Sequence, residues 1–293
     1  MNLSAQQIHE LCNIAKNAAR EAGVYIQTRF NEPYEKRHKT GGDSLASQIV
    51  TDVDLKAQQT ILEYLQGSIE KYDLGLLTEE ANDDHSRLRK DYFWCIDPID
   101  GTLPFTEHRT GYAVSIALVS RSGDPVIGVA YIPDLEDCYI AITGEGVTLN
   151  GSALIPAKTD SSHLHLYMDR SFREEPYYGS VIEELQRYAK RNMRLEAFEH
   201  TALGGVRNAL SVLRAVNACY FKFPKPSQGG GSIWDYAATR LFFEELARPV
   251  SNASGKRLNL NDPETTFMNR QGVVFATHRD IQNFLLELAT KIS

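Results

Sequence analysis

Cysteine is scarce in this chain, and its four copies lie far apart, at Cys12, Cys95, Cys138 and Cys219. None belongs to a C-x-x-C pair, so the sequence excludes a cysteine-based zinc cluster and a dense disulfide framework. We therefore expect buried, reduced thiols and a cytoplasmic protein.

Long apolar runs are missing as well. No stretch approaches the ~18 consecutive apolar residues of a membrane-spanning helix, and residues 1–23 mix charged and apolar side chains, unlike a secretory signal. Positive charge is not in excess, because 31 Lys and Arg stand against 38 Asp and Glu, for a net charge of -7. We therefore expect neither nucleic acid nor a membrane as a partner.

What remains is ordinary globular composition, with 293 residues of which 42% are hydrophobic and 24% charged. This length predicts two domains, or one large sandwich built from two halves. We place the boundary softly within residues 155–162, which gives an α+β half over residues 1–157 and an α/β half over residues 158–293.

Periodic patterns support an α+β first half. Apolar residues recur at helical spacing from Ile8 to Ile26, and Ser4 with Gln7 resembles a capping box ahead of them. A second helix is expected from about Asp54 to Gln66, after a loop at residues 39–47. The first convincing strand is expected at residues 92–96, followed by an antiparallel meander over residues 112–149.

After Pro156 the pattern alternates between strands and helices, which is typical of an α/β half. The expected strands are residues 163–168, 218–223 and 272–277. The expected helices are residues 175–190, 205–216, 234–247 and 281–292.

The most informative segment is residues 95–102, Cys-Ile-Asp-Pro-Ile-Asp-Gly-Thr, at the end of an apolar strand. Asp97 and Asp100 can converge on a hard cation such as Mg²⁺, because the intervening Pro stiffens the backbone and the following Gly tolerates unusual dihedrals. Gly101 and Thr102 could then start a helix whose N–H groups point at an anion. The same residues also suit a simple strand-ending turn.

Further acidic positions favour the metal interpretation by their joint order. Glu79 and Glu80 follow an apolar pair, Asp54 lies near the start of a helix, and Asp235 follows Trp234 at the start of another. Each alone could be a helix-terminal residue or a solvated loop residue. The combination carries the argument.

In this order the motifs resemble the inositol monophosphatase superfamily of metal-dependent, lithium-sensitive phosphatases. The matching segments span most of the chain: I-V-T-D-V-D-L-K around Asp54, L-L-T-E-E at Glu79, W-C-I-D-P-I-D-G-T ending at Thr102, G-E-G-V-T-L-N-G at residues 144–151 and W-D-Y-A-A at residues 234–238. The resemblance implies the layered αβαβα sandwich shared with fructose-1,6-bisphosphatase, with a metal cleft between the halves.

The resemblance also implies two or three Mg²⁺ ions as cofactor. One ion would be held by Glu79, Asp97 and the main-chain carbonyl of Ile99. Another would be held by Asp97, Asp100 and Asp235, and a third, weaker ion would lie near Glu79.

By the same resemblance, Thr102 and Asp54 orient and deprotonate the attacking water, with Glu79 beside them. N–H groups around Gly101 and Thr102 would hold phosphate oxygens. The other expected substrate contacts are Gly204, Gly205, Arg207 and Asp235.

This assignment agrees with elementary chemistry. A phosphate monoester dianion repels hydroxide, and two metal ions ~3.5–4 Å apart supply charge neutralisation, an activated water and in-line geometry. No histidine nucleophile is needed, and the eight histidines form no metal-ligand spacing beyond His163-x-His165, which on a strand places both side chains on one face.

The chain also departs from the family pattern. Residues 244–249 replace the usual E-A-G-G after the W-D helix, and Lys222 and Lys225 stand where inositol phosphatases place an acidic residue. The lysines could bind a second phosphate on the substrate. They could instead be solvated loop residues, which is the usual state of lysine.

These observations predict a Mg²⁺-dependent phosphomonoesterase acting on a small phosphorylated substrate, with inositol monophosphate as the default. One alternative is a 3'(2'),5'-bisphosphate nucleotidase acting on adenosine 3',5'-bisphosphate. Another is a non-catalytic phosphate-ligand binding module on the same scaffold. A homodimer is compatible with each of these functions.

Overall fold

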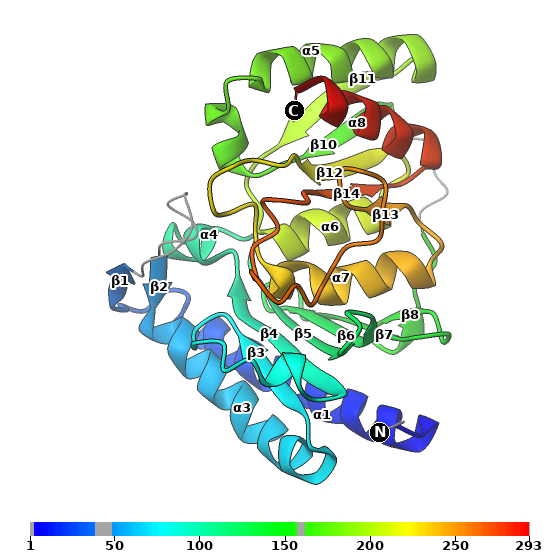
Figure 1. Cartoon of the computed structure of the whole chain (residues 1–293). Helices are drawn as coiled ribbons and strands as arrows, with labels where there is room; N and C mark the ends of the chain where they lie inside the picture. Colours follow the sequence, from blue (N-terminus) through cyan, green and yellow to red (C-terminus); the bar gives the residue numbers. More distant parts are fainter. Residues whose placement is uncertain (1–2, 39–48, 157–161, 293) are drawn as a thin grey trace.

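The computed structural model describes residues 3–38, 49–156 and 162–292. Its α-helices are α1 (Ala5–Arg29), α3 (Asp52–Tyr72), α4 (Thr102–Thr106), α5 (Tyr178–Tyr188), α6 (Gly205–Arg214), α7 (Ile233–Glu245) and α8 (Arg279–Ile292). From bottom to top in Figure 1, α1 and α3 cover a seven-stranded sheet, α6 and α7 form a middle layer, and a five-stranded sheet lies below α5 and α8. The expected αβαβα sandwich is confirmed.

The seven-stranded sheet carries the first half of the site. In sheet order its strands are β3 (Gly75–Thr78), β4 (Tyr92–Asp100), β5 (Ala113–Ser120), β6 (Pro125–Ile132), β7 (Asp137–Ile142), β8 (Val147–Leu149) and β9 (Ser152–Ala153). Strand β3 pairs parallel to β4, and the later pairs are antiparallel, so the predicted meander is confirmed.

The strand predicted at residues 92–96 is present as the first part of β4, but it is not the first strand of the chain. The short strands β1 (Lys36–His38), β2 (Ile49–Thr51) and β3 precede them, and β4 itself continues to Asp100. Segments of three or four residues are too short to show an alternating pattern, which explains why the sequence did not reveal them.

The five-stranded sheet has the order β11 (Glu196–His200), β10 (His163–Tyr167), β12 (Ala218–Lys222), β14 (Val273–Ala276) and β13 (Val250–Ser251). Strand β10 is parallel to β11 and β12, whereas β14 is antiparallel to its neighbours. The three predicted strands are present. The edge strands β11 and β13 were not predicted, because β11 is half-exposed and β13 has two residues.

Helix starts follow their local sequence. Ser4 and Gln7 form the expected capping box of α1. Helix α3 begins at Asp52 rather than Asp54, because the Thr51 hydroxyl caps it by accepting the N–H of Asp54. The predicted loop at residues 39–47 lies outside the described residues.

The two predicted halves share a hydrophobic core. Buried residues of the first sheet, such as Leu77 and Ala117, belong to the same core as Val206 of α6 and Tyr236 of α7. The proposed boundary after residue 157 falls outside the described residues. Helix α7 belongs to the second predicted half, yet it packs directly on the first sheet.

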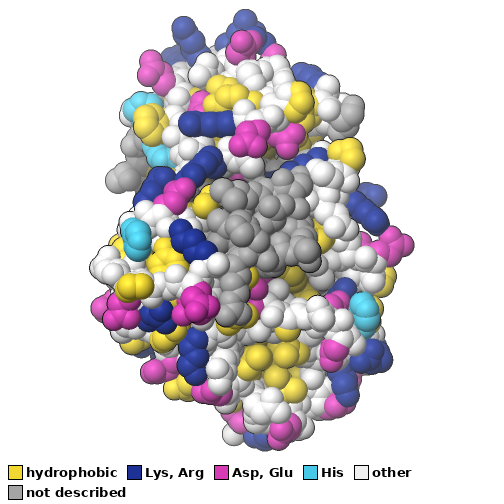
Figure 2. All heavy atoms as spheres, turned by 90° about the vertical axis from the view of Figure 1, so that its left-hand side faces the viewer, with side chains coloured by type: hydrophobic (Ala, Val, Ile, Leu, Met, Phe, Trp, Pro, Cys, Tyr) yellow, Lys and Arg dark blue, Asp and Glu magenta, His cyan; other side chains and the backbone are white. Residues whose placement is uncertain are grey.

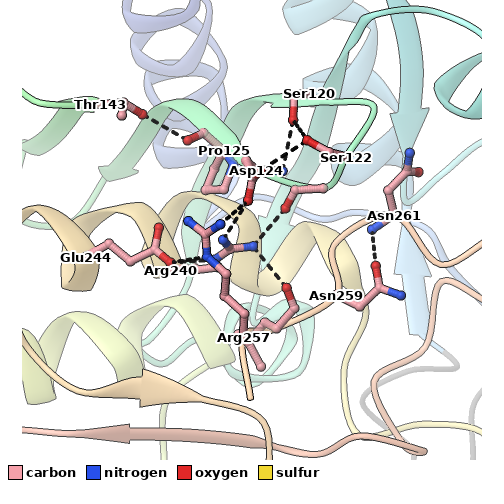
Figure 3. Close-up of polar contacts among 12 residues, drawn as sticks. Ser120, Ser122, Asp124, Pro125, Thr143, Arg240, Glu244, Arg257, Asn259 and Asn261 are labelled. Carbon is pink, nitrogen blue, oxygen red and sulfur yellow. Dashed lines mark hydrogen bonds and ion pairs between the residues drawn. The ribbon is translucent and has the colours of Figure 1, made fainter. Parts of the chain in front are cut away.

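A buried guanidinium fixes α7 on that sheet. Arg240 is 1% exposed and donates to the carbonyl oxygens of Gly123 and Leu258, at 2.8 and 2.9 Å. It also pairs with Asp124 and Glu244, as Figure 3 shows. These contacts join α7 to the turn between β5 and β6, and α7 carries Asp235 in its first turn.

Two other expectations concern single residue types. All four cysteines are buried and free, and the rings of His163 and His165 pack on one another, with centroids 6.2 Å apart, on one face of β10. No helix within the described ranges has the length and apolar character to cross a membrane. On the face drawn in Figure 2, basic side chains are interspersed with acidic ones.

Candidate functional site

Three predicted carboxylates meet between the first sheet and the middle helix layer. Asp97 and Asp100 end β4, and Asp235 lies in the first turn of α7. One oxygen from each lies within 4.8 Å of the others. The pairing of β4 with β5 shifts register between Asp97 and Asp100, an irregularity that changes how successive side chains point.

Backbone N–H groups orient these carboxylates. Asp100 accepts from the N–H of Gly205 and of Val206, both at 2.8 Å, so the positive end of α6 faces it. Asp97 accepts the N–H of Ile99 at 3.0 Å. Asp235 accepts the N–H of Ser232 at 3.1 Å in the capping box of α7.

Close approach requires glycine at one of these contacts. A Cβ atom on Gly204 would lie 2.4 Å from Oδ2 of Asp100 and 2.9 Å from the Cα of Gly101. Gly101 itself has φ +89°, in the left-handed region that side chains rarely adopt. These two glycines allow the D-G turn to pack against the start of α6.

Burial and mutual repulsion dominate the electrostatics. Burial raises the pKa of Asp97 well above its usual range, and the negative charges of Glu79 and Asp235 raise it further. The pKa of Asp100 is raised well above its usual range by burial and then by Asp235. Burial raises the pKa of Asp235 to about 6, although Lys222 opposes this shift.

This donor set fits a hard divalent cation. Every candidate ligand is an oxygen, which Mg²⁺ and Ca²⁺ prefer over nitrogen or sulfur. A cation would also remove the repulsion that raises the pKa values of these buried carboxyl groups.

Glu79 and Ile99 border the same group. Glu79 follows β3, and its N–H donates to the carbonyl of Ile96 at 3.1 Å, which places it beside the end of β4. Its carboxyl group hydrogen-bonds with Asp97. The carbonyl of Ile99 lies 3.1 Å from the Thr102 hydroxyl.

Thr102 and Asp54 form a buried pair from two distant segments. The Thr102 hydroxyl donates to Oδ1 of Asp54 at 2.9 Å, and the N–H of Thr51 donates to Oδ2 of Asp54 at 2.8 Å. Burial raises the pKa of Asp54 to about 6, against the opposing hydrogen bonds from Thr51. Asp54 is therefore oriented at both oxygens and holds its proton more tightly than a solvated carboxyl group.

A cavity of about 350 Å³ joins these groups. Most of the sequence-predicted site residues line it: Glu79, Asp97, Ile99, Asp100, Gly101, Thr102, Gly204, Gly205, Lys222, Lys225 and Asp235. Asp54 reaches the cavity through its hydrogen bond to Thr102.

The role of Arg207 as a substrate contact stays a prediction. Arg207 is not among the described residues that line the cavity. Its guanidinium instead pairs with Asp134 at 2.8 Å, and both side chains are 12% exposed. This carboxylate, which follows β6, orients the guanidinium of Arg207.

The two lysines have partners that the sequence did not reveal. Lys222 lies 2.6 Å from Asp169, and Lys225 lies 3.6 Å from Glu175. Neither is a solvated loop residue, since their side chains are 14% and 18% exposed. The partners follow β10, and no local pattern could link them to residues on and after β12.

Known proteins are similar to this chain in sequence. The chain is 33% identical over 249 residues to the Nus factor SuhB of Escherichia coli K12, covering 85% of this chain and 87% of that protein. It is 26% identical over 262 residues to the fructose-1,6-bisphosphatase/inositol-1-monophosphatase of Thermotoga maritima, covering 85% and 88%.

A solved structure supports the same fold. The extragenic suppressor protein suhB from Bartonella henselae superposes with a TM-score of 0.71 at 24% identity, over 95% of this chain and 98% of that one. Residues 7–293 match the inositol monophosphatase family as a whole. The chain therefore belongs to the inositol monophosphatase family.

Proposed function

We propose that this chain is a Mg²⁺-dependent phosphomonoesterase that acts on a small phosphorylated alcohol. The observation that carries the proposal is the convergence of Asp97, Asp100 and Asp235 on one point of the cavity that Thr102 also lines. Membership of a phosphatase-type family supports it.

Glu79, Asp97 and the carbonyl of Ile99 would hold one ion, and Asp97, Asp100 and Asp235 another, with a third near Glu79. When bound, Mg²⁺ neutralises phosphate charge and lowers the pKa of the attacking water.

The protein's own residues then handle the proton. The Thr102 oxygen accepts a hydrogen bond from the attacking water while its hydroxyl hydrogen points at Asp54. As the water oxygen bonds to phosphorus, Thr102 takes a proton from the water and passes its own to Asp54. The bond between phosphorus and the ester oxygen breaks, and the alkoxide takes a proton from a solvent water and leaves as the alcohol. A carboxyl group with a pKa of about 6 suits this role near neutral pH.

An inositol monophosphate-type polyol is the substrate we favour. Lys222 and Lys225 each hold a carboxylate of the protein, so a second phosphate would have to displace Asp169 or Glu175. Paired donors and acceptors instead suit hydroxyl groups, which both donate and accept. The name of the Thermotoga maritima relative includes inositol-1-monophosphatase activity.

Adenosine 3',5'-bisphosphate is the second candidate, because the cations Arg170, Lys222 and Lys225 all line one cavity. Its base would need an aromatic slot, and the half-buried Tyr177, Trp234 and Phe267 line the cavity. The decisive measurement is kcat/KM for both substrates in Mg²⁺. We expect a preference above about 100-fold, or about 2.7 kcal/mol, for the polyol monophosphate; the reverse preference would identify a nucleotidase.

A non-catalytic binding module is the third candidate, since one relative is named a Nus factor. Calorimetry with inositol monophosphate, paired with an assay for released phosphate in saturating Mg²⁺, separates the two. Tight binding without phosphate release over hours would favour the module.

We also propose lithium sensitivity, a cytoplasmic location and a homodimer. Lithium is the simplest to test, by comparing rates in LiCl and in KCl at equal ionic strength. Indistinguishable curves would argue against a second ion at Asp100 and Asp235.

A further inference from the structure

Lys222 is a buried cation at the border of the carboxylate cluster. It ends β12, its side chain is 14% exposed, and its Nζ lies 2.6 Å from Oδ2 of Asp169. Both residues line the cavity that Asp100 and Asp235 also line. An ion pair at this position differs from a surface pair, because solvent screens it much less.

The contacts of Asp169 place this pair one side chain away from the cluster. The Tyr220 hydroxyl donates to Oδ1 of Asp169 at 3.2 Å. A Cβ atom built on Gly205 would lie 3.3 Å from that hydroxyl, 3.5 Å from Oδ1 of Asp100 and 3.7 Å from Cβ of Asp235. Tyr220, Asp100 and Asp235 thus surround one glycine.

Lys222 also lies against a residue of α7. Its Nζ lies 5.6 Å from the centre of the Tyr236 ring, and Tyr236 directly follows Asp235. A cation within about 6 Å of a ring centre is attracted to the ring. Asp169 and Tyr236 therefore hold the ammonium group between them, which keeps its charge near Asp235.

The charge of Lys222 is maintained in the folded protein. Burial alone would lower its pKa, but Asp169, Tyr236 and Asp235 together hold the pKa well above its usual range. Because this ammonium group lies against the residue that directly follows Asp235, a metal ion at Asp235 would meet the same positive charge.

We propose that Lys222, held in place by Asp169, is a fixed cation that weakens divalent-ion binding at Asp100 and Asp235. This inference rests on the proposed function, which assigns those two carboxylates to Mg²⁺. Like charges repel, so an ion on this side binds at higher Mg²⁺ concentration than an ion held by Glu79 and Asp97. Lys222 thereby makes occupancy of the second position depend on the Mg²⁺ concentration.

Isothermal titration calorimetry of the full chain with Mg²⁺ tests this without reference to turnover. Lys222→Met should tighten the weaker binding phase by about tenfold or more, because it removes the repulsion. Asp169→Asn should weaken the same phase, because it leaves the charge of Lys222 uncompensated. The two substitutions therefore shift affinity in opposite directions.

Two variants serve as matched controls. Lys222→Arg keeps the charge and should stay within about threefold of the parent. Lys225→Met removes a cation from the same cavity, but one that pairs with Glu175 instead of Asp169, and should also stay within about threefold.

Unchanged or weaker Mg²⁺ binding by folded Lys222→Met would overturn the proposal. If that variant does not fold by circular dichroism, Asp169→Asn decides: tighter or unchanged binding overturns the proposal, and weaker binding supports it. Phosphate release from p-nitrophenyl phosphate by the parent separates this result from the proposed function. If the Mg²⁺ affinities shift as predicted but no phosphate is released, only the proposed function is contradicted. If phosphate is released but the Mg²⁺ affinities do not shift, only this inference is contradicted.

Discussion

The cavity has two walls that differ in whether their charged side chains are paired with opposite charges. The carboxylate wall consists of Glu79, Asp97, Asp100 and Asp235, whose like charges are packed together. The paired wall carries Lys222 with Asp169 and Lys225 with Glu175, as well as Arg170, which makes two 2.7 Å hydrogen bonds to Glu107. Only the carboxylate wall gains stability from an added cation, because each cation of the paired wall already has a carboxylate partner and carries positive charge itself.

The difference shows how a fold separates reactivity from shape. Crowded buried carboxylates raise the free energy of the metal-free protein, and that cost is what makes a cation bind. Paired charges add little to net charge and define where a substrate can lie. Removing a carboxylate from the carboxylate wall should therefore lower activity without lowering the unfolding free energy of the metal-free protein.

Asp97→Asn is expected to have the largest effect, because it alters a carboxylate assigned to both ions. We expect kcat/KM to fall by about 10³-fold or more. The unfolding free energy of the metal-free protein should stay equal or rise, since one repelling charge is removed. Activity within about tenfold of the parent would contradict the shared-ligand role.

Thr102→Ala tests the buried proton pair without changing the charge of the carboxylate wall. It removes the hydroxyl that lies 2.9 Å from Asp54. We expect kcat to fall by about 10²-fold or more, with Mg²⁺ affinity by calorimetry nearly unchanged. A fall in Mg²⁺ affinity that accounts for the whole loss would show that Thr102 serves the metal instead.

Gly204→Ala tests how closely the wall is packed. The added Cβ would lie 2.4 Å from a carboxylate oxygen of Asp100, so Asp100 or α6 must move. We expect a loss of about 1–3 kcal/mol in stability and at least about tenfold in kcat/KM. Gly67→Ala is the control, since a Cβ there meets nothing within 4 Å.

The ionisation of Asp54 should lower the unfolding free energy of the metal-free protein as pH rises. The pKa of Asp54 is about 6 in the folded chain, raised from 3.8 by burial. Its stabilising contribution is complete below about pH 4 and is lost as pH rises through about 6, because the folded state binds the proton more tightly.

Comparing the parent with Asp54→Asn isolates this group. The unfolding free energy of the parent relative to the variant should fall by on the order of 2–3 kcal/mol between about pH 4 and pH 7. Urea titrations in chelator measure the difference. A difference that is flat or grows with pH would show that Asp54 is ionised at low pH in the folded protein.

Arg207→Met should have the smallest effect on catalysis, because Arg207 pairs with Asp134 away from the cavity lining. We expect kcat/KM within about threefold of the parent and a stability loss of about 1–3 kcal/mol from the uncompensated Asp134. A selective rise in KM would instead return Arg207 to the substrate pocket.

Local sequence was sufficient for much of the fold. Helix α1 was predictable because its capping box and apolar spacing lie within one segment, and the meander because its strands are joined by short turns. Strands β3, β11 and β13 escaped prediction, since short or half-exposed strands bury too few side chains to leave a pattern.

The sequence by itself determined which carboxylates are candidate metal ligands, because Asp97, Asp100 and Asp235 occur in motifs that can be recognised without any knowledge of contacts. Only the tertiary structure decided that these carboxylates line one cavity. It also brought Thr102 within hydrogen-bond distance of Asp54. It also decided what the basic residues do. The role of a basic side chain depends on the group that the folded chain places within a few ångströms of it, and for Lys222 that group is Asp169, which follows a different strand.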